Sequence, residues 1–148
     1  MRSVRIYTSG LAALLAVLLA TPVFAQTPGP LDGLWLSTNT PEATSITKGA
    51  RGFEEKVLIE ASMATREIFS QYGFTPTPSV VISTSPLIKY ETTYVDATFG
   101  TLKVEGTVAA TLTSVSGKMT WTRKDGNVWV YNFSMVKIGT GPEPPQGS

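Results

Sequence analysis

From Ser79 to Ile138 the chain is dominated by residues that favour strands, and in places they alternate with a period of two. Between Thr101 and Leu112, leucine, valine and alanine share one face, while threonine, lysine and glutamate share the other. Successive side chains of a strand point to opposite faces, so this pattern indicates an antiparallel sheet with one buried and one solvated face. We predict strands at 79–83, 87–95, 98–105, 107–115, 118–123 and 127–138, after a first strand at 31–37.

The last two of these strands form a hairpin whose register can be predicted. A three-residue loop, 124–126, places Trp121 opposite Trp129 and Met119 opposite Tyr131, so that the large apolar side chains share a face. The same loop puts its glycine at the left-handed position of a bulged turn, where glycine is favoured.

The segment from Gly52 to Tyr72 predicts one long helix. Glu54 and Glu55 would lie in its first turn, where the helix dipole favours negative charge, and Gly73 follows at the position of a left-handed C-cap. The apolar residues that recur at helical spacing are Phe53, Val57, Leu58, Ala61, Ala64, Ile68, Phe69 and Tyr72.

A helix with one apolar face must bury it against another layer. The predicted fold class is therefore α+β, with one long helix packed on a curved antiparallel sheet of about five to seven strands. The aromatic face of the last hairpin is the expected receiving surface for the helix.

The first 25 residues have the three parts of a cleavable signal peptide. Arg2 and Arg5 give a positive start, Leu11–Ala20 is an unbroken apolar run, and Val23 and Ala25 suit the two positions that a signal peptidase reads. The apolar run is about half the length that a membrane span needs. We expect cleavage before Gln26, no stable membrane anchor afterwards, and a periplasmic or secreted bacterial protein.

The rest of the chain divides into a flexible leader at 26–30, a single domain at 31–138 and a tail at 139–148. The tail is rich in glycine and proline and is expected to be disordered. Ten basic and eleven acidic residues remain once Arg2 and Arg5 are removed, so the charge gives no reason to expect nucleic acid as a partner.

Neither cysteine nor histidine occurs in the sequence. This composition excludes Ser-His-Asp and Cys-His mechanisms and the usual zinc and copper sites, and we expect no metal and no cofactor. A hydrolase would have to use carboxylates, of which Glu91, Asp96 and Glu105 lie nearest the predicted sheet. Glu91 and Asp96 point to opposite faces of a regular strand, so catalysis is a disfavoured alternative unless a cleft holds two of the three.

Gly33-Leu34-Trp35 is a G-x-W motif at the start of the first predicted strand, and a helical segment and an antiparallel meander follow it. This order resembles the calycins, a group that includes lipocalins, fatty-acid-binding proteins and bacterial lipocalin-like proteins. The resemblance implies a β-barrel that holds an apolar ligand, with the tryptophan packed across its closed end. A lipocalin-like small β-barrel capped by a helix is therefore the alternative fold.

Two groups of aromatic residues are candidates for ligand binding. The tyrosines of the 87–95 strand alternate with Thr92 and are expected to form a partly exposed face, while the aromatic row of the last hairpin forms either a pocket or the core beneath the helix. The candidate ligand-binding residues are Tyr90, Tyr94, Trp121, Trp129 and Tyr131.

These features favour an exported, non-catalytic binding module for a small apolar ligand or an envelope protein. A second hypothesis is a periplasmic or secreted inhibitor or immunity-type factor, which would act through an exposed loop at 75–78 or 83–86 and would have no internal cavity. A carboxylate-based hydrolase is the third.

Overall fold

Antiparallel strands make up most of the protein, whose computed structural model describes residues 28–84 and 86–141. Two helices of four residues each, α1 (Ala43–Ile46) and α2 (Glu67–Ser70), are the only helices in that part of the chain. The strands are β1 (Gly33–Pro41), β2 (Phe53–Glu60), β3 (Met63–Arg66), β4 (Thr77–Pro78), β5 (Val80–Thr84), β6 (Leu87–Asp96), β7 (Gly100–Val108), β8 (Ser114–Thr122) and β9 (Val128–Gly139).

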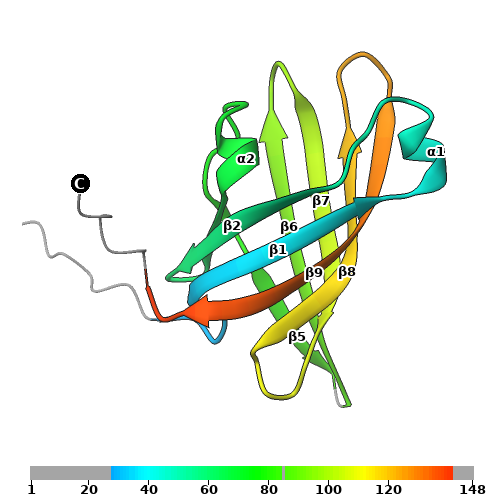
Figure 1. The fold of residues 1–148 in the computed structure, drawn as a ribbon. Helices are drawn as coiled ribbons and strands as arrows, with labels where there is room; N and C mark the ends of the chain where they lie inside the picture. Colours follow the sequence, from blue (N-terminus) through cyan, green and yellow to red (C-terminus); the bar gives the residue numbers. More distant parts are fainter. Residues whose placement is uncertain (1–27, 85, 142–148) are drawn as a thin grey trace, which may run out of the picture.

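The strands curl into a nearly closed barrel (Figure 1). Their order is β4-β3-β2-β1-β9-β8-β7-β6-β5, and every neighbouring pair is antiparallel. Ser79 alone separates β4 from β5, so one extended segment joins the two ends of this order, pairing with β3 at its start and with β6 at its end. Counting that segment once gives the eight strands of the barrel.

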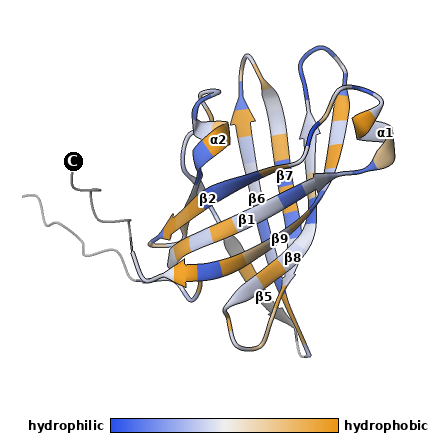
Figure 2. Cartoon of the chain, viewed as in Figure 1, coloured by the Kyte–Doolittle hydropathy of each residue, from blue (hydrophilic) through white to orange (hydrophobic). Residues whose placement is uncertain are grey.

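The core fills the inside of the barrel, where alternate residues of each strand are buried. Trp35 lies in this core, is fully buried, and its indole nitrogen donates a hydrogen bond to the Leu31 carbonyl oxygen at 2.9 Å. The ammonium group of Lys137 lies 5.9 Å from the centre of the Trp35 ring. Apolar and polar residues alternate along the strands in Figure 2, as expected when one face of each strand is inside.

Two glycines separate two aromatic residues in one row of paired residues that runs across four neighbouring strands. Tyr90 of β6 is opposite Gly106 of β7, which is opposite Gly117 of β8, which is opposite Phe133 of β9. A Cβ atom at Gly106 would lie 3.0 Å from the Phe133 ring, so the aromatic ring fills the space that the glycine leaves. The two glycines have no side chains, so they leave room on the inner face of the sheet for the large aromatic rings beside them.

The predicted hairpin is confirmed. Trp121 is opposite Trp129, and Met119 is opposite Tyr131. The Arg123 amide donates to the Asn127 carbonyl oxygen at 2.9 Å, and Gly126 has the left-handed φ of 86°.

The predicted fold class is wrong, because the segment from Gly52 to Tyr72 is not a long helix. It forms β2, a tight turn, β3 and the four-residue α2, and helix accounts for only 7% of the structure. The barrel of the alternative prediction is present, without the long helix.

The segment was predicted as a helix because its apolar residues fit both the spacing of a helix and the alternation of a strand. Phe53 and Val57 are four residues apart, as on a helix, but they also share the inner face of β2 with Ile59. Glu55 lies between them on that face and is buried, which interrupts the apolar alternation that would have indicated a strand.

The turn between β2 and β3 also depends on a distant residue. Ala61 and Ser62 have positive φ angles of 49° and 63°, which are unfavourable for residues with a side chain. The Asp32 carboxylate accepts hydrogen bonds from both backbone N–H groups, at 2.7 and 3.0 Å. No pattern within the segment itself indicates this support.

Other boundaries also differ from the predictions. The predicted strand at 107–115 is wrong, because β7 ends at Val108, Leu112 has a φ of 59° in the turn, and β8 begins at Ser114. Of the loops considered for an inhibitor, 75–78 ends in β4, and 83–86 includes a residue outside the described part. The predicted signal peptide and residues 142–148 of the predicted tail also lie outside the described residues.

Candidate ligand-binding site

An aromatic pocket of about 260 Å³ lies at the mouth of the barrel, at the end away from Trp35. We call it the mouth pocket. It is formed by the loop after α1, the start of β2, α2 with the residues that follow it, and the turn end of the β8–β9 hairpin. Its lining residues are Gly49, Arg51, Gly52, Phe53, Ile68, Phe69, Tyr72, Trp121, Trp129 and Tyr131.

The walls of the mouth pocket are held by edge-to-face ring contacts. The Trp121 and Trp129 rings, paired across β8 and β9, are 5.7 Å apart, and the Phe69 ring of α2 lies 5.3 Å from Trp121. Phe53 of β2 packs against Tyr131 at 5.4 Å. These contacts connect α2 to both sides of the barrel and give the pocket rigid aromatic faces.

Hydrogen-bond donors and positive charges gather around this aromatic surface. The Trp129 indole nitrogen is buried and has no hydrogen-bond partner among the described residues. The Arg123 guanidinium lies 4.6 Å from the centre of the Trp129 ring and 5.4 Å from that of Trp121. Arg51 is exposed at the rim. The pocket therefore combines a planar apolar surface with an unpaired N–H donor on one of its wall residues.

The phenol of Tyr131, a wall residue of the mouth pocket, is protonated and uncharged at neutral pH. Burial raises the pKa of Tyr131, the neighbouring Tyr72 adds to this, and Arg123 partly opposes it. Tyr131 is therefore uncharged at neutral pH, and the mouth pocket presents no tyrosinate to repel an electron-rich ligand.

The structure brings three of the five predicted site residues together. Trp121, Trp129 and Tyr131 all line the mouth pocket. Tyr90 and Tyr94 do not, and their predicted partial exposure is wrong, since they are 0% and 1% exposed inside the barrel. Their alternation was recognised from the sequence, but the long-range closure of the sheet decides which face of β6 is inside.

Sequence reasoning missed a polar cluster in the barrel interior. Arg66 of β3 and Glu55 of β2 form an ion pair with both side chains fully removed from solvent, and Arg66 Nε donates to Glu55 Oε1 at 2.8 Å. Arg66 Nη2 also donates to Ser37 Oγ and Asn39 Oδ1, each at 3.2 Å. Burial disfavours the charged guanidinium, but Glu55 together with Tyr94 and Tyr90 outweighs this effect, and the pKa of Arg66 is raised.

The same carboxylate positions a wall of the mouth pocket. Glu55 Oε2 accepts a hydrogen bond from the backbone N–H of Ile68 at 3.2 Å, at the start of α2. Ile68 and Phe69 line the pocket. The interior ion pair and the pocket are thus connected through one hydrogen bond. An arginine on the buried face of a strand was the available sequence signal, but it was read as part of a helix.

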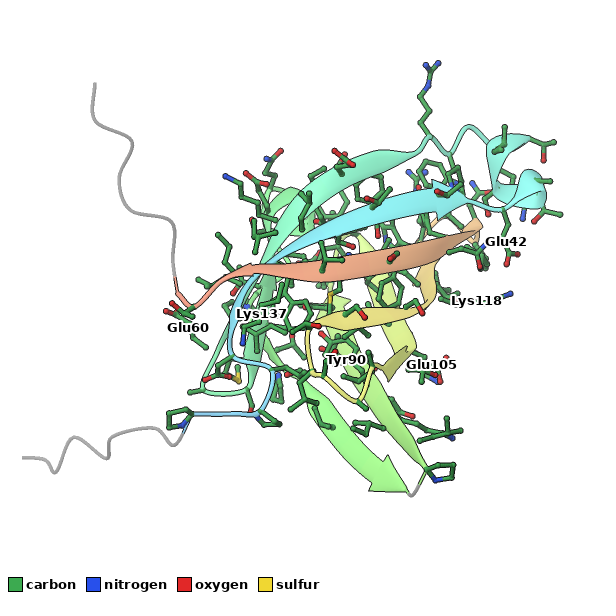
Figure 3. All side chains as sticks on the ribbon, turned by 60° about the horizontal axis from the view of Figure 1, so that its bottom comes forward. Glu42, Glu60, Tyr90, Glu105, Lys118 and Lys137 are labelled. Atoms are coloured by element: carbon green, nitrogen blue, oxygen red, sulfur yellow. The ribbon has the colours of Figure 1, made fainter. Side chains whose placement is uncertain are left out.

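Two of the three carboxylates considered for hydrolysis do share a groove. Glu91 of β6 is directly opposite Glu105 of β7, and both line a groove of about 350 Å³ on the outer face of the sheet, over Gly106 and Gly117. Glu105 is half exposed and pairs with Lys103 at 2.9 Å. An acid catalyst needs a desolvated carboxyl group, which this surface position does not provide. Figure 3 shows Glu105 and Lys118 on the outside of the barrel, whereas Tyr90 points inward.

Within the described ranges, no group of three or more acidic, histidine or cysteine side chains could hold a metal ion. None of the helices found there has the length and apolar character needed to cross a membrane. Searches against protein-family models, curated proteins and solved structures each found no match.

Proposed function

We propose that the protein is a non-catalytic binding module that takes a small planar aromatic ligand in the mouth pocket. The observation that carries this proposal is that Trp129, a wall residue of the aromatic mouth pocket, has a buried indole N–H without a hydrogen-bond partner among the described residues. A buried donor of this kind costs free energy unless an acceptor occupies the site. A ligand with an acceptor atom would supply that partner.

The size and walls of the pocket favour a small flat molecule. Its volume of about 260 Å³ lies just below the roughly 300–1,000 Å³ typical of sites for drug-sized ligands. The faces of Trp121 and Trp129 and the rings around them suit stacked or edge-on contact with another aromatic ring.

The charges near the pocket favour an acceptor that is anionic. Arg51 is the one charged residue of the lining, and the Arg123 guanidinium lies near the rings of both paired tryptophans. Asp125 Oδ2 lies 3.6 Å from Arg123 Nη2, and the Asp125 side chain is about half exposed. A sulfonate or carboxylate on the ligand would lie close to Arg51 and to the indole N–H of Trp129.

The dye 1-anilinonaphthalene-8-sulfonate (ANS) has fused rings, a phenyl ring and a sulfonate, and it is the probe for this site. We expect saturable binding of ANS to the folded protein. Tyr72→Ala removes a wall residue that is 41% exposed and should weaken binding roughly 2- to 10-fold. Val136→Ala, an exposed position on the outside of β9, is the matched control and should leave binding unchanged. Non-saturable binding, or equal affinities for both variants, would contradict the proposal.

An envelope protein is a second candidate partner, and the hairpin tip between β6 and β7 favours it. Val95 is 70% exposed, and Phe99 is 37% exposed beside Tyr72, with ring centres 5.3 Å apart. Exposed apolar groups near a pocket are typical of protein contacts. Affinity capture from an envelope extract with the wild type and with Val95→Lys would test this. A partner that binds the hairpin tip should be captured by the wild type and lost with the variant. A partner captured equally by both proteins would not use the tip.

We also propose that the protein is exported and that it is related to lipocalin-like proteins. Support for the relationship comes from the G-x-W tryptophan, Trp35, which lies buried at the barrel end away from the mouth pocket. Export rests on the sequence of the first 25 residues. Mass spectrometry of protein recovered from a bacterial host should find Gln26 as the first residue, and an intact Met1 would contradict periplasmic or secreted localisation.

A further inference from the structure

Four polar atoms in the barrel interior are buried without a hydrogen-bond partner among the described residues. They are Arg66 Nη1, Tyr90 OH, Thr92 Oγ1 and Tyr94 OH. Buried polar atoms are nearly always paired in folded proteins, with protein groups or with ordered water. The Thr92 and Tyr94 hydroxyl groups are close enough to interact with each other, whereas Arg66 Nη1 and Tyr90 OH have no hydrogen-bond partner in the described part of the chain and indicate that a further group binds here.

These atoms belong to one cluster. Tyr90, Thr92 and Tyr94 alternate along the inner face of β6, and Arg66 projects from the inner face of β3. The positive charge of Arg66 opposes the rise in pKa that burial causes in both tyrosines, and the neighbouring Thr92 hydroxyl group also lowers the pKa of Tyr94. Burial still raises the pKa of Tyr94 to about 12, so its phenol stays protonated at neutral pH.

The charges of the cluster favour a neutral occupant. Arg66 is the one fully buried cation among residues 28–84 and 86–141, and Glu55 already balances it. An anion would add a negative charge in a desolvated place with no further cation to offset it. The guanidinium nitrogen can only donate, while the three hydroxyl groups can rotate to donate. The cluster is thus suited to an uncharged acceptor oxygen.

We propose that the interior of the barrel contains a binding site for one neutral acceptor oxygen, held by Arg66 Nη1 with the hydroxyl groups of Tyr90, Thr92 and Tyr94. The oxygen belongs either to an enclosed water molecule or to the carbonyl group of a small ketone or aldehyde. This site differs from the mouth pocket, because Phe74 packs against both Tyr94 and Trp121 and lies between them, with ring distances of 6.5 and 6.3 Å. It does not depend on the function proposed for that pocket.

Isosteric variants test whether the hydroxyl groups have a partner. If an oxygen is bound, Tyr90→Phe and Tyr94→Phe each remove a hydrogen bond and should lower the melting temperature by roughly 3–6 °C. If the hydroxyls are unpaired, each variant removes a buried unsatisfied group, and the melting temperature stays the same or rises, which would overturn the proposal. Thr93→Val, which removes a hydroxyl group from the exposed outer face of the same strand, is the control and should change nothing.

A crystal structure at about 1.5 Å resolution would identify the source of the oxygen. A single round peak within hydrogen-bond distance of Arg66 Nη1 and the tyrosine hydroxyls supports the site, with water as its occupant. Crystals soaked in acetone, the probe for the carbonyl class, support the ketone source if its density replaces that peak. An empty cluster in both crystals would overturn the proposal, whatever ANS does at the mouth pocket.

Discussion

Arg66 and Glu55 form an ion pair that is entirely enclosed by the barrel, with side-chain exposures of 0% for both residues. The guanidinium comes from β3 and the carboxylate from β2. Because Glu55 Oε2 also accepts the backbone N–H of Ile68, the pair links the barrel interior to α2 and to the mouth pocket.

We predict that the pair matters for stability chiefly because neither charge can remain buried alone. Glu55→Leu and Arg66→Met should each lower the free energy of unfolding by about 3–5 kcal/mol, since each leaves one uncompensated charge. The double variant should be more stable than the more affected single variant, because no charge remains buried. Urea unfolding of the wild type and the three variants measures this, and a double variant as unstable as the sum of the singles would contradict it.

Asp32 should stabilise the turn between β2 and β3 only while its carboxylate is charged. Desolvation by burial raises the pKa of Asp32. This effect is outweighed by hydrogen bonds from the backbone of Ser62, Gly29 and Ala61 and by the charge of Lys137. The pKa of Asp32 therefore lies below its ordinary value of 3.8. Because the pKa is lowered in the folded state, the contribution of the Asp32 carboxylate to the free energy of unfolding is complete above its ordinary pKa. This contribution is lost as the pH falls through the pKa of Asp32 in the folded protein.

The test for Asp32 is a comparison of Asp32→Asn with the wild type across pH. At pH 7 the variant should be less stable by about 1 kcal/mol, because an amide cannot accept both N–H groups as a carboxylate does. The difference should shrink as the pH drops below 3.8. Chemical denaturation at pH 7, 4 and 2.5 measures it, and a difference that is constant with pH would show that the charge has no part in it.

Gly117 should not tolerate even a methyl group. A Cβ atom there would overlap the Glu105 carbonyl oxygen and lie 2.5 Å from the Gly106 Cα, both of which are backbone atoms of the neighbouring strand. We expect Gly117→Ala to cost about 3 kcal/mol or to disrupt the pairing of β7 and β8. At Gly139 the nearest atom to a new Cβ is 3.6 Å away, so Gly139→Ala is the control and should be nearly neutral in thermal unfolding. Equal losses for the two variants would contradict the close approach at Gly117.

The parts of the fold that were predicted correctly are those with local determinants. The register of the last hairpin follows from the alternation of Trp121, Trp129 and Tyr131 and from the glycine of its turn, all within a few residues. Three of the predicted site residues lie on this hairpin, and the structure places them in one pocket.

The parts that were missed depend on contacts between distant residues. Glu55 is buried on a strand because its side chain pairs with Arg66 of the neighbouring strand, and the 61–62 turn is held by a carboxylate about thirty residues earlier in the chain. Neither contact is visible in the hydrophobic pattern of the segment, so the helical period was favoured there. For the same reason the sequence did not reveal that Tyr90 and Tyr94 face a buried arginine.

The most direct test of ligand binding at the mouth pocket is a two-dimensional ¹⁵N–¹H spectrum of the indole N–H groups during titration with ANS. The protein has three tryptophans. Trp35 and Trp121 donate to the carbonyl oxygens of Leu31 and Phe99 at 2.9 and 2.8 Å, while the Trp129 indole has no hydrogen-bond partner in the part of the chain that the structure describes. The Trp129 signal should shift saturably as its N–H gains an acceptor, and the Trp35 signal, at the opposite end of the barrel, should stay in place. A Trp129 signal that does not move while ANS is bound, or a Trp35 signal that moves with it, would contradict binding at this pocket.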